Sequence, residues 1–267
     1  MLDLEFFQLT HPGLQRDHNE DYLDCFAPQS QDEAQSRGWL FALADGVGGQ
    51  DRGEVASKLA VETLIEGFGH ASRNDALTGV MPKLLQQANS RVYETAMSTG
   101  PGGSSMATTL VACALRYDRA IIAHAGDSRC YLVRQGFAAP LTRDHTVSGE
   151  QLRMGLITAA EARASGSSHI LSRSLGSGMF LNVDTSEHQL IPGDVLLLCS
   201  DGLHHSVGPE DIANSLAHGN AVLQDAAGEL VNLANKRDGS DNISVQLVRI
   251  KSVERVGMYR GRHYKLH

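Results

Sequence analysis

The chain has 267 residues, a formal net charge of -8, 42% hydrophobic residues and 20% charged residues. This composition is sufficient for a sizeable core, and the length fits one large β-containing domain. The negative charge argues against a nucleic-acid partner, whose phosphates need a basic surface. The longest strictly apolar runs, such as WLFALA and LVACAL, are too short to span a bilayer.

Nothing in the sequence indicates secretion. The amino terminus has no basic segment followed by a long apolar stretch, so we expect no secretory signal. The four cysteines, Cys25, Cys113, Cys130 and Cys199, form no CxxC pair. They are typical of free thiols in a reducing compartment, and we expect a cytoplasmic protein.

Segments with the composition of β-strands recur along the chain. They are Leu2–Thr10, Tyr22–Ala27, Trp39–Ala44, Thr108–Arg116, Ala120–His124, Arg129–Arg134, Leu181–Leu190, Asp194–Ser200 and Ile243–Ile250. Several, such as LVACAL and VLLLC, are apolar without alternation, which is typical of strands covered on both faces. The links around YDR and GDS are only a few residues long, and links this short join antiparallel neighbours.

Three segments have apolar residues at helical spacing, namely Gly53–Phe68, Ala76–Ala96 and Leu223–Arg237. Pro82, inside the second segment, predicts a kink or a later start of that helix. Antiparallel sheets that are apolar on both faces need a partner sheet inside and helices outside. We therefore predict an α+β fold, a four-layer α-β-β-α sandwich in which two antiparallel sheets are flanked by helices.

Acidic residues stand at the ends of several predicted strands. Asp45 and Asp201 follow strands, Asp21 and Asp241 precede strands, and Asp127 lies in the turn GDSR. Taken singly, each is explained as a turn residue or a solvated acid. Because the start of an antiparallel strand lies beside the end of its neighbour, these acids can meet on one rim of the sandwich. Together they would repel one another without cations, and their hard oxygen atoms favour Mg²⁺ or Mn²⁺ over Zn²⁺.

Neighbouring residues extend this hypothesis. Gly46 keeps the backbone close to the acids, and its carbonyl offers a further oxygen ligand. Arg16 offers a guanidinium for bidentate capture of a phosphate, with a surface salt bridge as the alternative. His204 and His205 follow Asp201 directly, but adjacent side chains would point in different directions, which argues against a metal role for them.

The motifs RDHNED, ADGVGG, MATTLVA, GDSR, SRSLG, SDGL and SDNIS occur in this order. With them the chain resembles, over residues 4–250, the metal-dependent Ser/Thr protein phosphatases of the PPM or type 2C family, in its compact bacterial branch. That family has a four-layer sandwich fold. The resemblance implies a metal centre formed by Glu20, Asp21, Asp45, Gly46, Asp127, Asp201 and Asp241.

The resemblance also implies individual roles. Asp45 would bridge two ions, and the Gly46 carbonyl would bind one of them. Asp201 and Asp241 would complete the second coordination sphere, and Asp127 with Asp201 would match a third metal position.

The remaining roles concern the reaction. Glu20 and Asp21 would act directly or through metal-bound water, and Arg16 and Asp45 are the expected catalytic residues, Arg16 by holding the substrate phosphate. Many eukaryotic members carry a histidine just after the Asp-Gly pair as the proposed general acid, whereas this chain has Val47. We expect a metal-bound water to protonate the leaving group instead, with His18 and His145 as alternatives.

The predicted organisation is a phosphatase domain over residues 1–252 followed by a basic tail over residues 253–267. Within the domain, residues 144–170 resemble the family's mobile flap, which influences which substrates enter. We expect the tail to be a frayed, solvated end, with a docking segment for an acidic partner as the alternative.

The predicted function is hydrolysis of phosphoserine and phosphothreonine in proteins by direct attack of a hydroxide that bridges two Mn²⁺ or Mg²⁺ ions. Two ions are expected, with three as the alternative. Expected partners are phosphorylated proteins, a cognate bacterial Ser/Thr kinase and its substrates, with no nucleic acid, no membrane span and a monomeric chain. The alternatives are a catalytically dead module that binds phosphoproteins, against which the intact aspartate set argues, and a metal phosphohydrolase that acts on small molecules.

Overall fold

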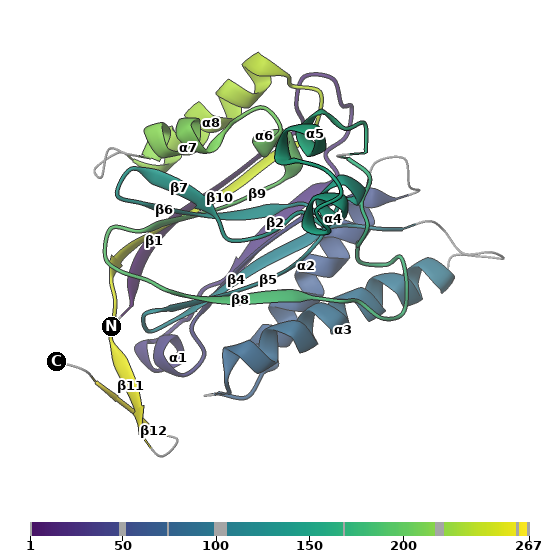
Figure 1. The fold of residues 1–267 in the computed structure, drawn as a ribbon. Helices are drawn as coiled ribbons and strands as arrows, with labels where there is room; N and C mark the ends of the chain where they lie inside the picture. The colour runs from purple at the N-terminus through teal and green to yellow at the C-terminus, as the bar shows by residue number, and fades with distance from the viewer. Residues whose placement is uncertain are drawn as a thin grey trace.

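The fold is a sandwich of four layers. We describe a computed structural model of the protein over residues 2–47, 52–73, 75–98, 106–167, 169–216, 222–259 and 262–265. Two five-stranded antiparallel sheets lie face to face, and helices cover the two outer faces (Figure 1). The predicted α-β-β-α architecture is confirmed.

The first sheet combines β1 from the beginning of the chain with strands from its later part. Its strand order is β1 (Asp3–His11), β10 (Ile243–Ser252), β9 (Val195–Cys199), β6 (Arg129–Arg134) and β7 (Phe137–Pro140). Helices α7 (Pro209–Leu216) and α8 (Leu223–Arg237) cover its outer face. The short helix α6 (Asp201–His204) follows β9 after a single residue, Ser200.

The second sheet contains the strands from the middle of the chain. Its order is β2 (Asp21–Phe26), β3 (Trp39–Asp45), β4 (Leu110–Arg116), β5 (Arg119–Ala125) and β8 (Asp184–Gln189). Helices α2 (Gly53–His70) and α3 (Leu77–Ser98) cover its outer face, and α1 (Gln31–Ser36) connects β2 with β3.

The lack of alternation in several strands has a direct structural reason. Val111 and Cys113 of β4 lie in the core between the two sheets, whereas Leu110 and Ala112 lie in the core under α2 and α3. A third core lies between the first sheet and α7 and α8. Because both faces of such strands are covered, both sets of side chains are apolar.

The sequence did not predict every element. The strand β7 and the helices α1 and α6 were missed because they are too short for a clear apolar period. The helix α7 was also missed, although Ile212, Ala213 and Leu216 form its buried apolar face. Pro82 lies inside α3, which begins at Leu77, so the later start, one of the two alternatives for this helix, is wrong. All four cysteines are free, as predicted.

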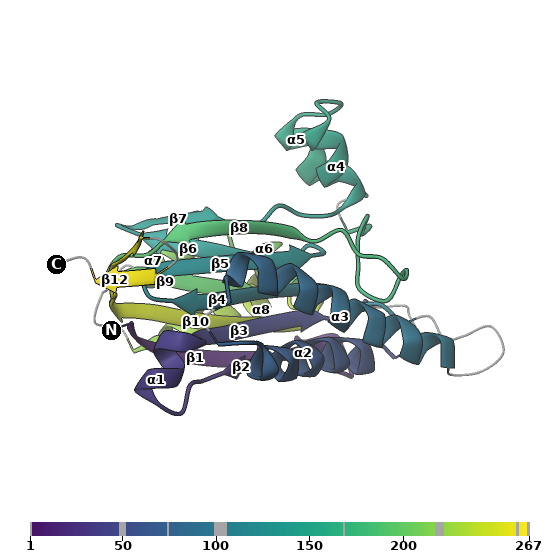
Figure 2. The same cartoon turned by 90° about the horizontal axis from the view of Figure 1, so that it is seen from below.

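Helices α4 (Val147–Arg153) and α5 (Ala159–Ala164) lie inside the flap segment, the name used here for residues 144–170. Figure 2 shows them projecting from the body of the sandwich. The side chains of Thr146 and Thr158 accept hydrogen bonds at the amino ends of the two helices, and Thr158 forms a capping box with Glu161. These caps explain why two short helices form away from the core.

The carboxyl-terminal segment differs from the predicted frayed end. Strands β11 (Val256–Tyr259) and β12 (Arg262–Lys265) pair in an antiparallel hairpin. Across the described residues, no helix has both the length and the apolar character that a membrane crossing requires.

Candidate active site

Asp21 and Asp45 are two acids of the candidate site that lie on adjacent strands. Asp45 is the last residue of β3, Asp21 is the first residue of β2, and the antiparallel register pairs them directly. Ser200 donates a hydrogen bond of 2.8 Å from its Oγ to Asp21 Oδ2, whereas Asp21 Oδ1 is buried without a hydrogen-bond partner. A buried carboxylate oxygen without a partner is costly, so this atom fits a position next to a bound cation.

The other predicted acids reach the same place from different elements. Asp127 lies in the turn between β5 and β6, Asp201 starts α6, and Asp241 precedes β10. A cleft of about 1300 Å³ is lined by Arg16, Glu20, Asp45, Gly46, Asp127, Asp201 and Asp241, together with residues of the flap segment and α3. The structure therefore brings all the predicted site residues to one cleft, with Asp21 paired to Asp45 at its edge.

The electrostatics of the cleft favour a bound cation. Burial raises the pKa of Asp21 to about 7, and repulsion by Asp201 and Asp241 adds to this effect. Burial also raises the pKa of Asp45 well above its usual value, with further repulsion from Asp21 and Asp201. Burial and then Asp201 do the same to the pKa of Asp127. Divalent cations would relieve this repulsion, and a set of oxygen donors fits Mg²⁺ or Mn²⁺.

Position 46 requires a glycine because its backbone lies close to the backbones of Glu20 and Gly53. Its N–H donates to the Glu20 carbonyl at 3.1 Å. A Cβ atom at Gly46 would lie 2.5 Å from the Gly53 backbone and 2.9 Å from the Glu20 carbonyl oxygen. The close approach keeps Glu20 in the cleft, where burial raises the pKa of its carboxyl and the Arg16 charge opposes that shift.

Arg16 lies in the loop between β1 and β2. Its Nη2 is 2.9 Å from Asp241 Oδ2, and its Nε donates to the Ser240 carbonyl at 3.3 Å. Arg16 therefore makes the salt bridge that the sequence left as an alternative, and it also lines the cleft. The ion pair holds a half-exposed guanidinium next to the acids.

Asn242 is a site residue that the sequence analysis missed. It is buried, and its Oδ1 accepts a hydrogen bond from the Glu20 N–H at 2.8 Å. Its Nδ2 donates to the carbonyls of Pro12 and His18, each at 2.9 Å. The side chain thus holds the loop that carries Arg16 and Glu20. Its signal was present in the motif SDNIS, from which only the aspartate was selected.

Two threonines of the motif MATTLVA hold Asp45 in place. Thr109 Oγ1 accepts a hydrogen bond from the Asp45 N–H at 3.0 Å, and Thr108 Oγ1 donates to the Asp45 carbonyl at 2.8 Å. Thr109 Oγ1 also shares a hydrogen bond of 2.7 Å with Ser128, next to Asp127. The sequence analysis assigned these threonines no role.

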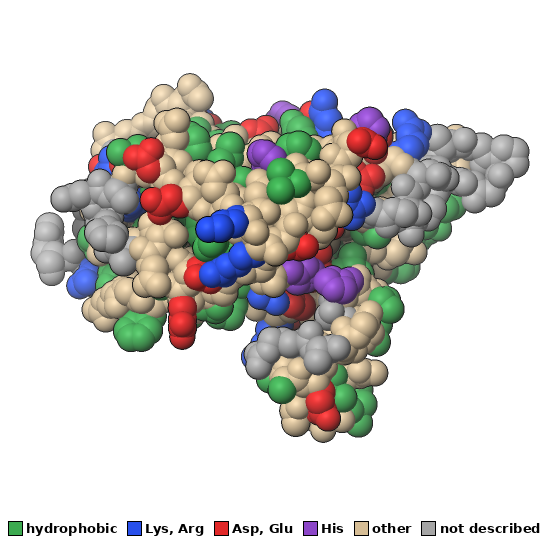
Figure 3. Space-filling view, turned by 90° about the horizontal axis from the view of Figure 1, so that it is seen from above, with side chains coloured by type: hydrophobic (Ala, Val, Ile, Leu, Met, Phe, Trp, Pro, Cys, Tyr) green, Lys and Arg blue, Asp and Glu red, His purple; other side chains and the backbone are tan. Residues whose placement is uncertain are grey.

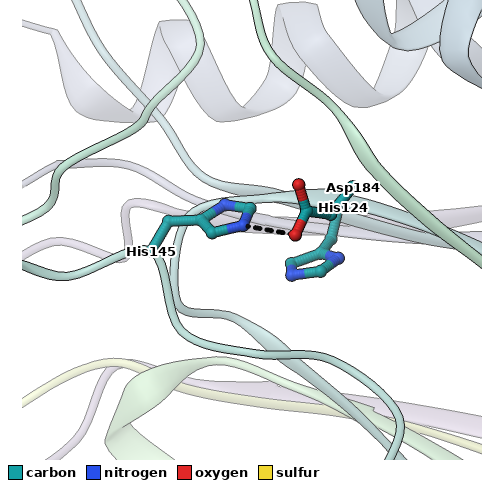
Figure 4. A group of neighbouring side chains, drawn as sticks. All are labelled: His124, His145 and Asp184. Atoms are coloured by element: carbon teal, nitrogen blue, oxygen red, sulfur yellow. Dashed lines mark ion pairs between the residues drawn. The ribbon is translucent and has the colours of Figure 1, made fainter. Parts of the chain in front are cut away.

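His145 does not lie where a general acid is needed. It is buried, its Nδ1 accepts a hydrogen bond from the Gly126 N–H at 3.2 Å, and its Nε2 is 3.3 Å from Asp184 Oδ2 (Figure 4). It is not among the residues that line the cleft. His18, the other alternative, is exposed in the loop between β1 and β2.

The surroundings of His145 connect the flap segment to β8. His124 stacks on His145 with ring centroids 4.6 Å apart. Arg173 donates to Asp184 at 2.8 Å and to Glu150 of α4 at 3.0 Å. His124, His145 and Asp184 are close enough to bind a metal ion, but the guanidinium already compensates the carboxylate. We therefore interpret this cluster as structural.

His204 and His205 point in different directions, as the sequence predicted. His204 is buried, and its Nε2 donates to the Asp127 carbonyl at 2.9 Å. His205 Nδ1 lies 3.5 Å from Asp201 Oδ2. His169, which the sequence analysis did not select, lies beside His205, and both line the cleft.

Comparisons with known proteins agree with this geometry. A family model described as Protein phosphatase 2C matches residues 18–247. The serine/threonine phosphatase stp of Listeria innocua is 34% identical over 256 residues, which cover 95% of this chain and 96% of the relative. The chain belongs to the protein phosphatase 2C family. The predicted resemblance and the predicted enzyme class, a phosphatase, are therefore confirmed.

Solved structures show the same likeness. The serine/threonine phosphatase of S. agalactiae is 31% identical with a TM-score of 0.82, and the alignment covers 93% of this chain and 100% of that one. The catalytic domain of the phosphatase PstP in complex with two manganese ions is 30% identical with a TM-score of 0.79, covering 94% and 100% of the two chains.

Proposed function

We propose that this chain is a Mg²⁺- or Mn²⁺-dependent phosphatase that removes phosphate from phosphoserine and phosphothreonine in proteins. The observation that carries the proposal is the meeting of five aspartates at one cleft with Arg16 at its edge. The relatives named as serine/threonine phosphatases support the substrate class, and the manganese complex of PstP supports the metal.

The residues present fit such ions. Asp45, the Gly46 carbonyl, Asp201 and Asp241 would hold two of them, and Asp127 with Asp201 would hold a third. Glu20 and Asp21 would act directly or through bound water. When bound, the ions supply Lewis-acid chemistry, which lowers the pKa of the attacking water and neutralises negative charge on the phosphate.

The chain's own residues would bind and orient the phosphate. Asp241 fixes one side of the Arg16 guanidinium at the cleft, and such a guanidinium can form charge-assisted hydrogen bonds to phosphate oxygens. The Val47 N–H donates to the Ala107 carbonyl at 3.0 Å, so it is not available to a substrate. We assign phosphate binding to Arg16 because its guanidinium lines the cleft.

We further propose that water attacks phosphorus directly, without a phosphorylated enzyme. The cysteine chemistry supports this route, because burial raises the pKa of Cys25 to about 11 and raises that of Cys199 further. Thiols in this state are poor nucleophiles at neutral pH. The phosphorylated substrates would come from a Ser/Thr kinase reaction, which this activity would oppose.

The test is turnover by metal-stripped protein after Mn²⁺ or Mg²⁺ is added, with phosphothreonine peptides compared with nucleotides. We expect metal-dependent release of phosphate from the peptides at a higher kcat/KM than from the nucleotides. Faster hydrolysis of nucleotides would favour a small-molecule phosphohydrolase. No hydrolysis of either substrate by a folded, Mn²⁺-binding protein would contradict the proposal.

A further inference from the structure

A group of side chains at the mouth of the cleft differs chemically from the carboxylate centre. His169, Asp201 and His205 each offer one ligand atom, and these atoms all lie within 4.8 Å of one another. His169 belongs to the flap segment, and His205 follows α6. Figure 3 shows histidine side chains beside acidic ones where the part that projects from the sandwich, with α4 and α5, meets the sandwich itself.

The distances within this group suit a bridging ion. His205 Nδ1 and Asp201 Oδ2 are 3.5 Å apart, longer than a good N–H···O hydrogen bond. A tetrahedral Zn²⁺ ion with ligand bonds of ~2.0–2.1 Å keeps its ligand atoms about 3.3 Å apart. The His169 ring lies edge-on to the His205 ring, with centroids 4.5 Å apart, so two imidazoles converge on the same carboxylate.

The charges around the group also favour a cation. Asp201 lines the same cleft as Asp45, Asp127 and Asp241, so the group lies among other acidic side chains. The nearby Arg129 is already held by two hydrogen bonds to Asp144, at 2.8 and 2.6 Å, which compensate its charge. This arrangement contrasts with the His124, His145 and Asp184 cluster, where a guanidinium pairs with the carboxylate itself.

We propose that His169, Asp201 and His205 bind a Zn²⁺ ion or a similar divalent transition metal, and that this ion joins the flap segment to helix α6 at the mouth of the cleft. Two imidazoles and one carboxylate are ligands that Zn²⁺ prefers over Mg²⁺. The proposal rests on side-chain geometry and is independent of the phosphatase activity. Asp201 is shared with the predicted carboxylate centre, so the two sites are neighbours.

The test measures metal binding without substrate. Untagged, metal-stripped protein is first saturated with Mg²⁺ to fill the carboxylate centre. The affinity for Zn²⁺ is then measured by competition with a chromogenic chelator. We expect His169→Asn and His205→Asn each to weaken one Zn²⁺ site by at least about 10-fold. The matched control is His70→Asn, because His70 is exposed at the end of α2, lines a different pocket and should leave the affinity unchanged.

Electron paramagnetic resonance of bound Cu²⁺ provides a second readout. We expect nitrogen hyperfine coupling from the imidazoles in the unchanged protein and its loss in the double variant His169→Asn/His205→Asn. Because His169 is exposed, its substitution should not disturb folding. Unchanged Zn²⁺ affinity in both single variants, or an oxygen-only Cu²⁺ spectrum, would overturn the proposal. Neither result depends on whether the protein hydrolyses phosphopeptides.

Discussion

Asp21 on β2 lies directly opposite Asp45 on β3 in the antiparallel register, so two acidic side chains from adjacent strands share the edge of the cleft. Burial raises the pKa of both carboxyls, and each also experiences repulsion from Asp201 and Asp241. Such a pair destabilises the metal-free protein whenever both groups are ionised.

The stability of the metal-free protein should depend on pH through Asp21. The folded carboxyl keeps its proton up to about pH 7, whereas an unfolded aspartate loses it near about pH 3.9. Between these values the folded state binds more protons, so the free energy of unfolding falls as pH rises, by ~1.4 kcal/mol per unit of pKa shift. The stabilising contribution of Asp21 is complete below the pKa of the unfolded aspartate and is lost as the pH rises past about 7.

Urea unfolding in a chelator at about pH 5 and about pH 8 measures this effect. We expect Asp21→Asn to flatten the pH dependence, whereas Asp225→Asn, an exposed acid at the start of α8, should not. Addition of Mn²⁺ at the higher pH should stabilise the unchanged protein. An equal pH dependence in Asp21→Asn and in the unchanged protein would contradict this prediction.

Asp45→Asn and Asp201→Asn should abolish the hydrolysis of p-nitrophenyl phosphate while the fold survives. Each change replaces an anionic metal ligand by a neutral amide, and removing a buried charge that repels its neighbours should not unfold the protein. Steady-state rates with Mn²⁺ measure the loss of hydrolysis, and circular dichroism shows whether the fold survives. Asp225→Asn is the control. Full Mn²⁺-dependent turnover by folded Asp45→Asn would refute the assigned role.

Arg16→Ala should chiefly raise KM. The guanidinium would bind substrate phosphate, and loss of a hydrogen bond to a charged group costs ~1.5–3 kcal/mol, or about 10- to 100-fold in KM. Arg16→Lys keeps the charge but loses the fork geometry, so its KM should be intermediate. Phosphopeptide kinetics test the order of the three proteins, and an unchanged KM in Arg16→Ala would remove Arg16 from the phosphate site.

Asn242→Ala should lower both stability and substrate affinity. The change leaves the Glu20 N–H and the carbonyls of Pro12 and His18 without this partner, and an unsatisfied buried polar group costs ~1–3 kcal/mol. The loop that carries Arg16 would then be less well positioned. Thermal unfolding and KM measure the two effects, with Gln29→Ala, an exposed amide beyond β2, as the control. A stability loss without any rise in KM would show that Asn242 is structural only.

Arg173→Ala should loosen the flap segment, because Arg173 connects Asp184 on β8 to Glu150 on α4. Chymotrypsin should then cleave faster within residues 144–170, where Leu152 and Leu156 are exposed. Arg153 also pairs with Glu150, at 2.8 Å, but its side chain is 59% exposed. Such surface pairs contribute little, so Arg153→Ala is the matched control. Equal cleavage rates in the two variants would contradict the proposed connection.

Much of the fold follows from local patterns in the sequence. Apolar runs without alternation, short links between strands and three amphipathic helices are sufficient to predict the layers, because each pattern reports how many faces of an element are covered. The short elements β7, α1 and α6 carry too few residues for such a period. The carboxyl-terminal hairpin was missed because its basic composition suggested a solvated end.

The sequence by itself determined which residue types stand at the strand ends, and antiparallel pairing made their approach predictable. Only the tertiary structure decided which polar groups meet: Asn242 with Glu20, Ser200 with Asp21, and His169 with His205. These partners come from distant segments, and their contacts depend on distances of a few ångströms that no local pattern encodes. A hydrogen bond or a metal ligand requires that accuracy, whereas burial of an apolar face does not.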